Sequence, residues 1–233
     1  FEPYFDDAYK VEKTAFQNKF NIRKDLKTIC FSCGDITTSK NDELYIESIM
    51  QAIQNQDIQE VNFIVRTSPA EDPKRFSELS KQYKTIIWNF PKWHLARNTH
   101  SEAWSQRVPT LEDLKDLRAM IEYSDLNINM LSTMSLDFMC HDKPVINPVF
   151  GHESNGLYND QRFLKYEHIQ IMNSFKATKI VKNKAELIEA INLYLENPKT
   201  DSLERHKLLK HHVMFPVLGT KERLVQKLLI SNK

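Results

Sequence analysis

The sequence has 233 residues, and its 32 Lys and Arg against 31 Asp and Glu give a net charge of +1 at pH 7. This balance gives no electrostatic reason to expect a nucleic acid or a charged membrane surface as a partner. Hydrophobic residues make up 41% and charged residues 27%, which excludes a disordered chain and predicts a soluble domain with a substantial core.

Membrane and secretory signals are lacking in the sequence. No apolar stretch approaches the roughly 20 residues that a spanning helix needs, so we expect no integral membrane segment. The first ten residues, FEPYFDDAYK, are acidic and aromatic, unlike a signal peptide, and their lack of an initiator Met suggests a processed or trimmed chain. Three cysteines are too few for a disulfide framework, which favours the reducing cytoplasm.

Cys30 and Cys33 form a CxxC pair that admits two interpretations. A redox motif would lie at a helix start, and a zinc site would need two further ligands at suitable spacing. Here the pair lies at the end of an apolar strand, and no second CxxC follows. We therefore expect packing thiols and no metal site.

Short β-rich runs alternate with amphipathic segments of helix length, which predicts parallel βαβ units. A lead-in segment, residues 1–25, precedes the first of them and is expected to be helical from Ala8 to Phe20. The expected strands are Thr28–Ser32, Val61–Arg66, Thr85–Trp88, Leu126–Asn129, Val145–Asn147 and Lys179–Val181.

Helix starts carry recognisable capping residues. Asn41 or Asp42 can cap the first helix after the lead-in, and Thr110 caps another that ends near Ser124, with Asp113 at its N3 position in a capping-box pattern. The helix capped by Asn41 or Asp42 is expected over Glu43–Gln54. The other expected helices are Pro73–Gln82, Thr133–Cys140, Ala185–Glu196, Asp201–His211 and Thr220–Leu229.

Two stretches carry no clear periodicity. Asn89–Thr110 is rich in Trp, His and Pro, and loops of this length inside compact domains are usually functional or mobile. Gly151–Asn159 is a polar loop with two glycines. The pattern as a whole predicts an α/β, Rossmann-like open parallel sheet of about six strands with helices on both faces. It would occupy residues 26–200, and C-terminal helices would follow over residues 201–233.

The turn Leu131-Ser132-Thr133 joins a buried strand to a short helix. It places two hydroxyls and several unpaired backbone N–H groups at a helix start, which suits a phosphate. Asp137 follows Thr133 by one helical turn, where a carboxylate can accept from sugar hydroxyls. The alternative is that Ser132 is an ordinary N-cap and Asp137 a solvated acid, and spacing alone does not decide between them.

The segment DLRAMIEYSDLNINMLSTMSLDFMCHDKPVINPVFG resembles the donor-binding half of GT-B-type glycosyltransferases, especially bacterial surface-polysaccharide and CDP-glycerol-transferase-like members. Those proteins carry a run of the form aD…ST…lE/D…kPvI. The resemblance covers Lys27 to Leu229 in the order of elements, and its specific part is Asp125–Pro148. It implies that Ser132 and Thr133 bind the donor diphosphate and that Asp137, an Asp where most relatives have Glu, binds the ribose.

The resemblance implies weaker assignments at other strand ends. Arg66 would neutralise the donor diphosphate. The alternative, with equal weight, is that Arg66 is an ordinary cation on the surface. Gly34 faces the cleft between domains and serves turn geometry. His152, Glu153 and Asn155 are candidates for sugar contacts.

The resemblance also places the nucleotide base near the loop Asn89–Thr110. Trp93 or its neighbour Trp88 could stack on the base there, although a tryptophan in a long loop more often anchors the fold. The base identity itself would depend on backbone contacts.

A GT-B enzyme needs two Rossmann-like domains, and this sequence supplies one. We therefore expect an N-terminal acceptor-binding domain or partner chain that holds the catalytic base. The donor would be a nucleotide-diphosphate sugar, and neither a metal nor a further cofactor is implied. The location would be cytoplasmic, peripheral to the inner membrane through the acceptor. The alternatives are a non-catalytic interaction domain of the same fold and half of a sugar-nucleotide epimerase.

Overall fold

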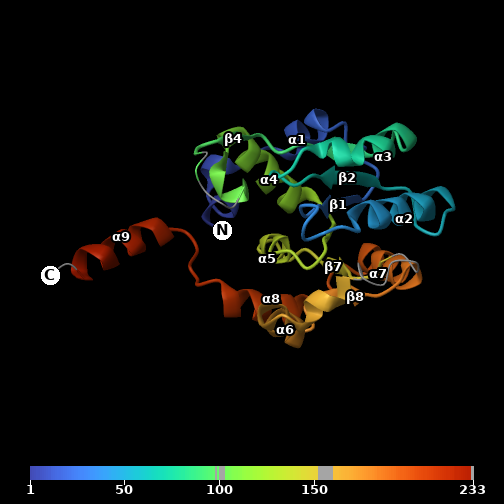
Figure 1. The fold of residues 1–233 in the computed structure, drawn as a ribbon. Helices are drawn as coiled ribbons and strands as arrows, with labels where there is room; N and C mark the ends of the chain where they lie inside the picture. The colour runs from blue at the N-terminus through green and yellow to red at the C-terminus, as the bar shows by residue number, and fades with distance from the viewer. Residues whose placement is uncertain (98, 100–102, 152–159, 232–233) are drawn as a thin grey trace.

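A six-stranded parallel sheet forms the centre of the computed structural model, which describes residues 1–97, 99, 103–151 and 160–231 (Figure 1). The strand order is β3-β2-β1-β6-β7-β8. The α/β, Rossmann-like fold that the sequence predicts is therefore confirmed. The strands are β1 (Thr28–Ser32), β2 (Asn62–Arg66), β3 (Ile87–Asn89), β6 (Leu126–Ile128), β7 (Val145–Pro148) and β8 (Lys179–Val181).

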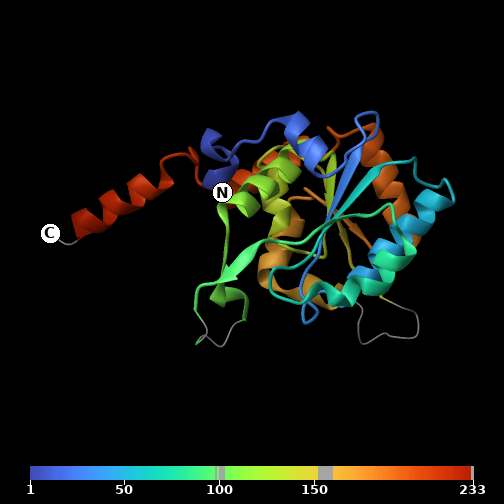
Figure 2. The ribbon, with the colours of Figure 1, turned by 90° about the horizontal axis from the view of Figure 1, so that it is seen from above.

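Helices cover both faces of this sheet (Figures 1 and 2). Every residue of β1 and β2 is buried, as expected for central strands with both faces covered, and this is why they read as continuous apolar runs. One face packs against α2 (Asp42–Gln54), α3 (Ser77–Gln82) and α7 (Lys184–Glu196), and the other against α4 (Leu111–Tyr123), α5 (Met134–Met139) and α8 (Ser202–His212).

Helix α8 is anchored by a fully buried arginine. The Arg205 guanidinium donates to Asp142 Oδ1 at 3.0 Å, to the Thr200 carbonyl at 2.6 Å and to the Pro198 carbonyl at 2.9 Å. Asp142 lies in the turn between α5 and β7 with a positive φ of 52°. The ion pair thus fixes the first C-terminal helix to the sheet.

The last helix, α9 (Thr220–Ser231), projects away from the rest of the molecule (Figures 1 and 2). No helix in the described part of the chain is long and apolar enough to cross a membrane. The helix nevertheless carries large apolar side chains that are mostly exposed, which are Leu224, Val225, Leu228, Leu229 and Ile230.

The lead-in segment packs along α4. It consists of the 3-10 turns η1 (Glu2–Tyr4) and η2 (Asp7–Tyr9) and of the helix α1 (Lys13–Lys19), so the helix expected from Ala8 to Phe20 is wrong in its first half. Lys10 and Glu12 are extended between these elements, and the intervening Val11 carbonyl accepts a 2.7 Å hydrogen bond from the Tyr123 hydroxyl. This tertiary contact takes a carbonyl that a continuous helix would use.

Several short secondary-structure elements are not predicted by the sequence pattern. The stretch expected to be irregular holds an antiparallel hairpin of β4 (Trp93–Leu95) and β5 (Arg107–Pro109), with the turn η4 (Ala103–Gln106) between the strands. The turn η3 (Pro73–Phe76) opens the predicted helix before α3. Two further unpredicted elements follow the second loop, namely η6 (Asp160–Lys165) and α6 (Glu167–Ser174).

Candidate functional site

One cavity lies where the order of the strands in the sheet reverses. From β1 the chain proceeds outward to β2 and β3, and it later returns to place β6 on the other side of β1. In open parallel sheets, ligands bind beyond the carboxyl ends of the strands at such a switch point. A cavity of about 530 Å³ is found there, lined by residues that follow β1, β2 and β6.

The turn after β6 forms one wall of this cavity. Leu131, Ser132 and Thr133 all line it. The Leu131 and Ser132 N–H groups both donate to Asn129, so they are not the unpaired groups that the sequence predicts. Leu131 has a positive φ of 49°, an uncommon conformation for a side chain of this size. The Ser132 hydroxyl accepts a 3.3 Å hydrogen bond from the Met134 N–H, whereas the Thr133 side chain caps nothing and is exposed.

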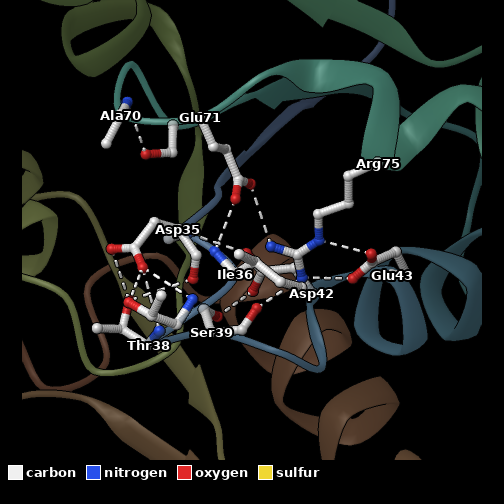
Figure 3. A network of polar contacts seen from close by, with 12 residues as sticks. Asp35, Ile36, Thr38, Ser39, Asp42, Glu43, Ala70, Glu71 and Arg75 are labelled. Atoms are coloured by element: carbon white, nitrogen blue, oxygen red, sulfur yellow. Dashed lines mark hydrogen bonds and ion pairs between the residues drawn. The ribbon is translucent and has the colours of Figure 1, made fainter. Parts of the chain in front are cut away.

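The loop after β1 also lines this cavity, and Figure 3 shows its polar contacts. Gly34 lies there, and a Cβ atom on it would approach the Ser39 Cβ to 2.6 Å. Its N–H donates at 2.9 Å to Asp42, whose carboxylate also accepts from the Ser39 hydroxyl. Gly34 is therefore required by close packing, and Asp42 supports this loop, where the sequence had suggested a helix cap.

Arg75 ties this loop to the loop after β2 (Figure 3). Its guanidinium pairs with Glu43 at the start of α2 and with Glu71 in the loop after β2, and it donates to the Ser39 carbonyl at 2.6 Å. Glu71 in turn accepts a 2.7 Å hydrogen bond from the Ile36 N–H. These contacts fix the loops that follow β1 and β2 relative to each other.

Arg66 lines the cavity at the end of β2, but its guanidinium is buried and paired. It donates to the two carboxylate oxygens of Asp113 at 3.1 and 2.7 Å and to Asn89 Oδ1 at 2.5 Å. Asp113 also accepts from Trp93 Nε1 at 2.8 Å. The capping-box role expected for Asp113 is wrong, because its carboxylate turns inward to Arg66; the Thr110 hydroxyl still accepts from the Asp113 N–H at 3.1 Å.

Asp137 lies one turn along α5 and is not among the described residues that line the cavity. Burial raises the pKa of Asp137 to about 6, and a hydrogen bond with the Tyr4 hydroxyl partly opposes this effect. The lead-in segment is held in this region by the Tyr4 carbonyl, which lies 3.1 Å from His141 Nε2. The carboxyl group proposed for the ribose therefore lies beside the lead-in segment.

Aromatic side chains from unpredicted elements complete the cavity. Tyr166, at the N-cap of α6, is 51% exposed and lies edge-on to Phe163 at 5.4 Å between ring centroids. His168 follows in the first turn of α6, and Trp93 of β4 lines the cavity as well. The sequence pattern indicates only Trp93 among them, because it does not show α6.

The remaining predicted residues give a mixed outcome. His152, Glu153 and Asn155 lie outside the described residues. Cys30 and Cys33 are free thiols, and burial raises the pKa of both, that of Cys30 to about 11. No group of three or more His, Cys, Asp or Glu side chains within the described ranges could hold a metal ion.

Comparison with known proteins relates this geometry to solved structures. The wall teichoic acid polymerase TagF, soaked with CDPG, superposes with a TM-score of 0.55 and 12% identity over 98% of this chain and 47% of its own. The C-terminal CMP-Kdo binding domain of WaaA from Acinetobacter baumannii superposes with a TM-score of 0.51 and 10% identity over 88% of this chain and 99% of its own. This chain has the fold of a GT-B C-terminal domain.

The same fold recurs in MnaA from S. aureus, in complex with UDP, with a TM-score of 0.50 and 13% identity over 87% of this chain and 44% of MnaA. The chain thus spans about half the length of TagF and MnaA and nearly the whole of the WaaA domain. No protein-family model matches the sequence, and no curated protein is significantly similar to it.

Proposed function

We propose that this chain is the donor-binding half of a glycosyltransferase and that it holds a nucleotide sugar in the cavity at the switch point of the sheet. The observation that carries the proposal is the cavity beyond the carboxyl ends of β1, β2 and β6, with the hydroxyl residues Ser132 and Thr133 in its wall, because ligands of open parallel sheets bind at such a switch point. The fold shared with a CMP-Kdo binding domain and with a teichoic acid polymerase supports a role in surface polysaccharide biosynthesis.

Each predicted site residue keeps a proposed role in this scheme. Ser132 and Thr133 bind the diphosphate, and Arg66 adds positive charge from the end of β2. Asp137 binds the ribose once the lead-in segment leaves room for it. The sugar is contacted from the loop that begins at Gly34, together with His152, Glu153 and Asn155 of the second loop.

The acceptor and the catalytic base belong to a second, N-terminal domain or a partner chain in this proposal. The exposed apolar side chains of α9, centred on Leu224 and Leu228, support such a partner, since exposed apolar faces of this kind usually mark interaction sites. The assembled enzyme would act in the cytoplasm on a membrane-linked acceptor.

Binding of nucleotides to the purified chain tests the proposal. We expect at least one of CDP, UDP, GDP, dTDP and CMP to raise the melting temperature and to give a measurable heat of binding, because a ligand that binds the folded state stabilises it by mass action. The double variant Ser132→Ala with Asp137→Ala should lose this response.

A matched double variant on the surface, Ser77→Ala with Asp57→Ala, changes the same residue types at exposed positions and should bind as the wild type does. A folded wild-type chain that responds to none of the five nucleotides would refute the donor-binding role.

A second candidate function is a non-catalytic interaction domain that keeps the fold. Two features favour it: the positive charge of Arg66 is offset by Asp113, and Asp35 adds a negative charge to the same cavity. Neither feature helps to hold a diphosphate. This candidate predicts no nucleotide response, so the binding experiment separates the two functions.

A further inference from the structure

A row of buried polar side chains lies beneath the cavity. Asn127 lies on β6 and Asn129 directly follows this strand, Asn147 lies on β7, and Ser32 is the last residue of β1. None of these side chains is more than 2% exposed. Strands that are covered on both faces are normally apolar, and an unpaired buried amide is costly. Their presence at this level of the sheet therefore requires a specific explanation.

These side chains form one connected hydrogen-bond network. The Asn127 side-chain amide donates to Ser32 Oγ at 2.9 Å, and Asn127 Oδ1 accepts from the Asn129 amide at 2.7 Å. The Asn147 amide donates to the Asn129 carbonyl at 2.8 Å and to Asn129 Oδ1 at 3.0 Å. The network thus joins β1, β6 and β7 below the site.

Asn129 connects this network to the cavity wall. Its Oδ1 accepts a 2.7 Å hydrogen bond from the Ser132 N–H, and its backbone carbonyl accepts from the Leu131 N–H at 3.1 Å. Leu131, between these two contacts, has the unfavourable positive φ of 49°. The side chain of Asn129 therefore helps to hold a strained turn in one conformation.

We infer that Asn129 is a positioning residue that keeps the Ser132-Thr133 turn ready for the phosphate of the donor, an inference that rests on the proposed function. Asn147 orients the Asn129 amide by donating to its oxygen. Asn127 has the same burial and belongs to the same network, where it contacts Ser32, the Cys30 carbonyl and the Asn129 amide. It makes no hydrogen bond to the turn, and without it the Asn129 amide still has the Ser135 hydroxyl as a partner at 3.2 Å. Asn127 therefore provides a matched control.

The experiment compares Asn129→Ala with Asn127→Ala. Both variants lose a buried amide, so similar falls in melting temperature are expected. Only Asn129→Ala should weaken nucleotide binding, by roughly tenfold, which corresponds to one lost hydrogen bond to the turn. Equal losses of affinity in the two variants would overturn the inference, since Asn129 would then act through stability alone.

Amide hydrogen exchange at Ser132 supplies a readout that needs no ligand. Exchange of the Ser132 N–H should accelerate at least tenfold in Asn129→Ala and stay near the wild-type rate in Asn127→Ala. If the wild type binds no nucleotide, the proposed function fails while this measurement still tests the positioning role. Unchanged exchange in Asn129→Ala would refute that role. Asn129→Ser and Asn127→Ser replace the alanine pair if either alanine variant does not fold.

Discussion

Replacing Asp113 by asparagine is expected to destabilise the protein and, at the same time, to strengthen anion binding in the cavity. The side chains of Asp113 and Arg66 are 2% and 7% exposed, and their closest atoms are 2.7 Å apart. Removing one charge of a buried pair typically costs about 3–5 kcal/mol, because the remaining charge stays buried without compensation. That remaining charge belongs to Arg66, a residue of the cavity lining whose guanidinium is itself buried, so affinity for a nucleotide should rise on the order of tenfold.

The pH dependence of this loss follows from the direction of the pKa shift. Burial alone would raise the pKa of Asp113, but the hydrogen bonds and charge of Arg66 outweigh burial and hold it below the usual range. The contribution of the pair to stability is therefore complete above the unfolded pKa of about 3.9 and is lost as the pH falls through the lower folded value. The difference in unfolding free energy between wild type and Asp113→Asn should narrow below about pH 4.

Arg66→Met removes the other charge of the same ion pair. It should destabilise the fold to a similar extent, but it should lower nucleotide affinity, because the remaining charge in the pair is then negative. Asp116→Asn on the same helix is the control: Asp116 is also buried, but it pairs at 2.7 Å with Lys19, whose side chain is 39% exposed. The positive charge left behind then stays in contact with solvent, so the change should cost less stability than Asp113→Asn and leave affinity unaltered. Equal effects of Asp113→Asn and Arg66→Met on affinity would exclude Arg66 from the anion site.

The sheet was largely predictable because buried parallel strands are continuous apolar runs. Thr28–Ser32 and Lys179–Val181 have the predicted bounds, and three other strands differ by one residue at one end. The edge strand β3 differs at both ends, by two residues at its start and one at its end. The hairpin of Trp93–Leu95 with Arg107–Pro109 was not predictable in the same way. Its strands are three residues long, mostly exposed and paired across a polar loop, so neither shows a periodic pattern.

The site was predictable where its chemistry is local and unpredictable where it depends on distant partners. The Ser132-Thr133 turn follows from a strand, two hydroxyl residues and a helix in direct succession. Asp113 looks like a capping residue because Thr110 is three positions away, whereas its partner Arg66 is 47 positions away. Asn129 reads as an ordinary strand residue, and only the packed sheet shows that its amide supports the turn.

Asp137→Asn is expected to stabilise the protein and to weaken nucleotide binding. Burial raises the pKa of Asp137 to about 6, so the folded state keeps a proton that the unfolded chain releases near pH 3.9. Ionised Asp137 therefore lowers the free energy of unfolding, whereas ionised Asp113 raises it. The loss of stability from Asp137 appears as the pH rises from about 4 to 6 and is constant above pH 6. The asparagine variant lacks this cost and should be more stable at pH 8, on the order of 1–3 kcal/mol.

Asp142→Asn, in the turn that follows α5, is the matched control, because the pKa of Asp142 is shifted in the opposite direction from that of Asp137. Although burial opposes it, hydrogen bonds from Lys199 and Ser202 and the charge of Arg205 hold the pKa of Asp142 below its usual range. This variant should therefore be less stable than the wild type above pH 4 and should bind nucleotide normally. Thermal unfolding between pH 4 and 8 measures both variants.

A gain in stability together with a loss of affinity in Asp137→Asn would identify a carboxylate that is retained for binding at the expense of the fold. Buried polar groups that conflict with local stability are expected at functional sites, because selection there acts on the ligand. A gain in stability with unchanged affinity would instead exclude Asp137 from the ribose contact. Lower stability at pH 8 would mean that the Tyr4 hydroxyl compensates the burial of the carboxylate, and that the lead-in segment is held in place by this contact.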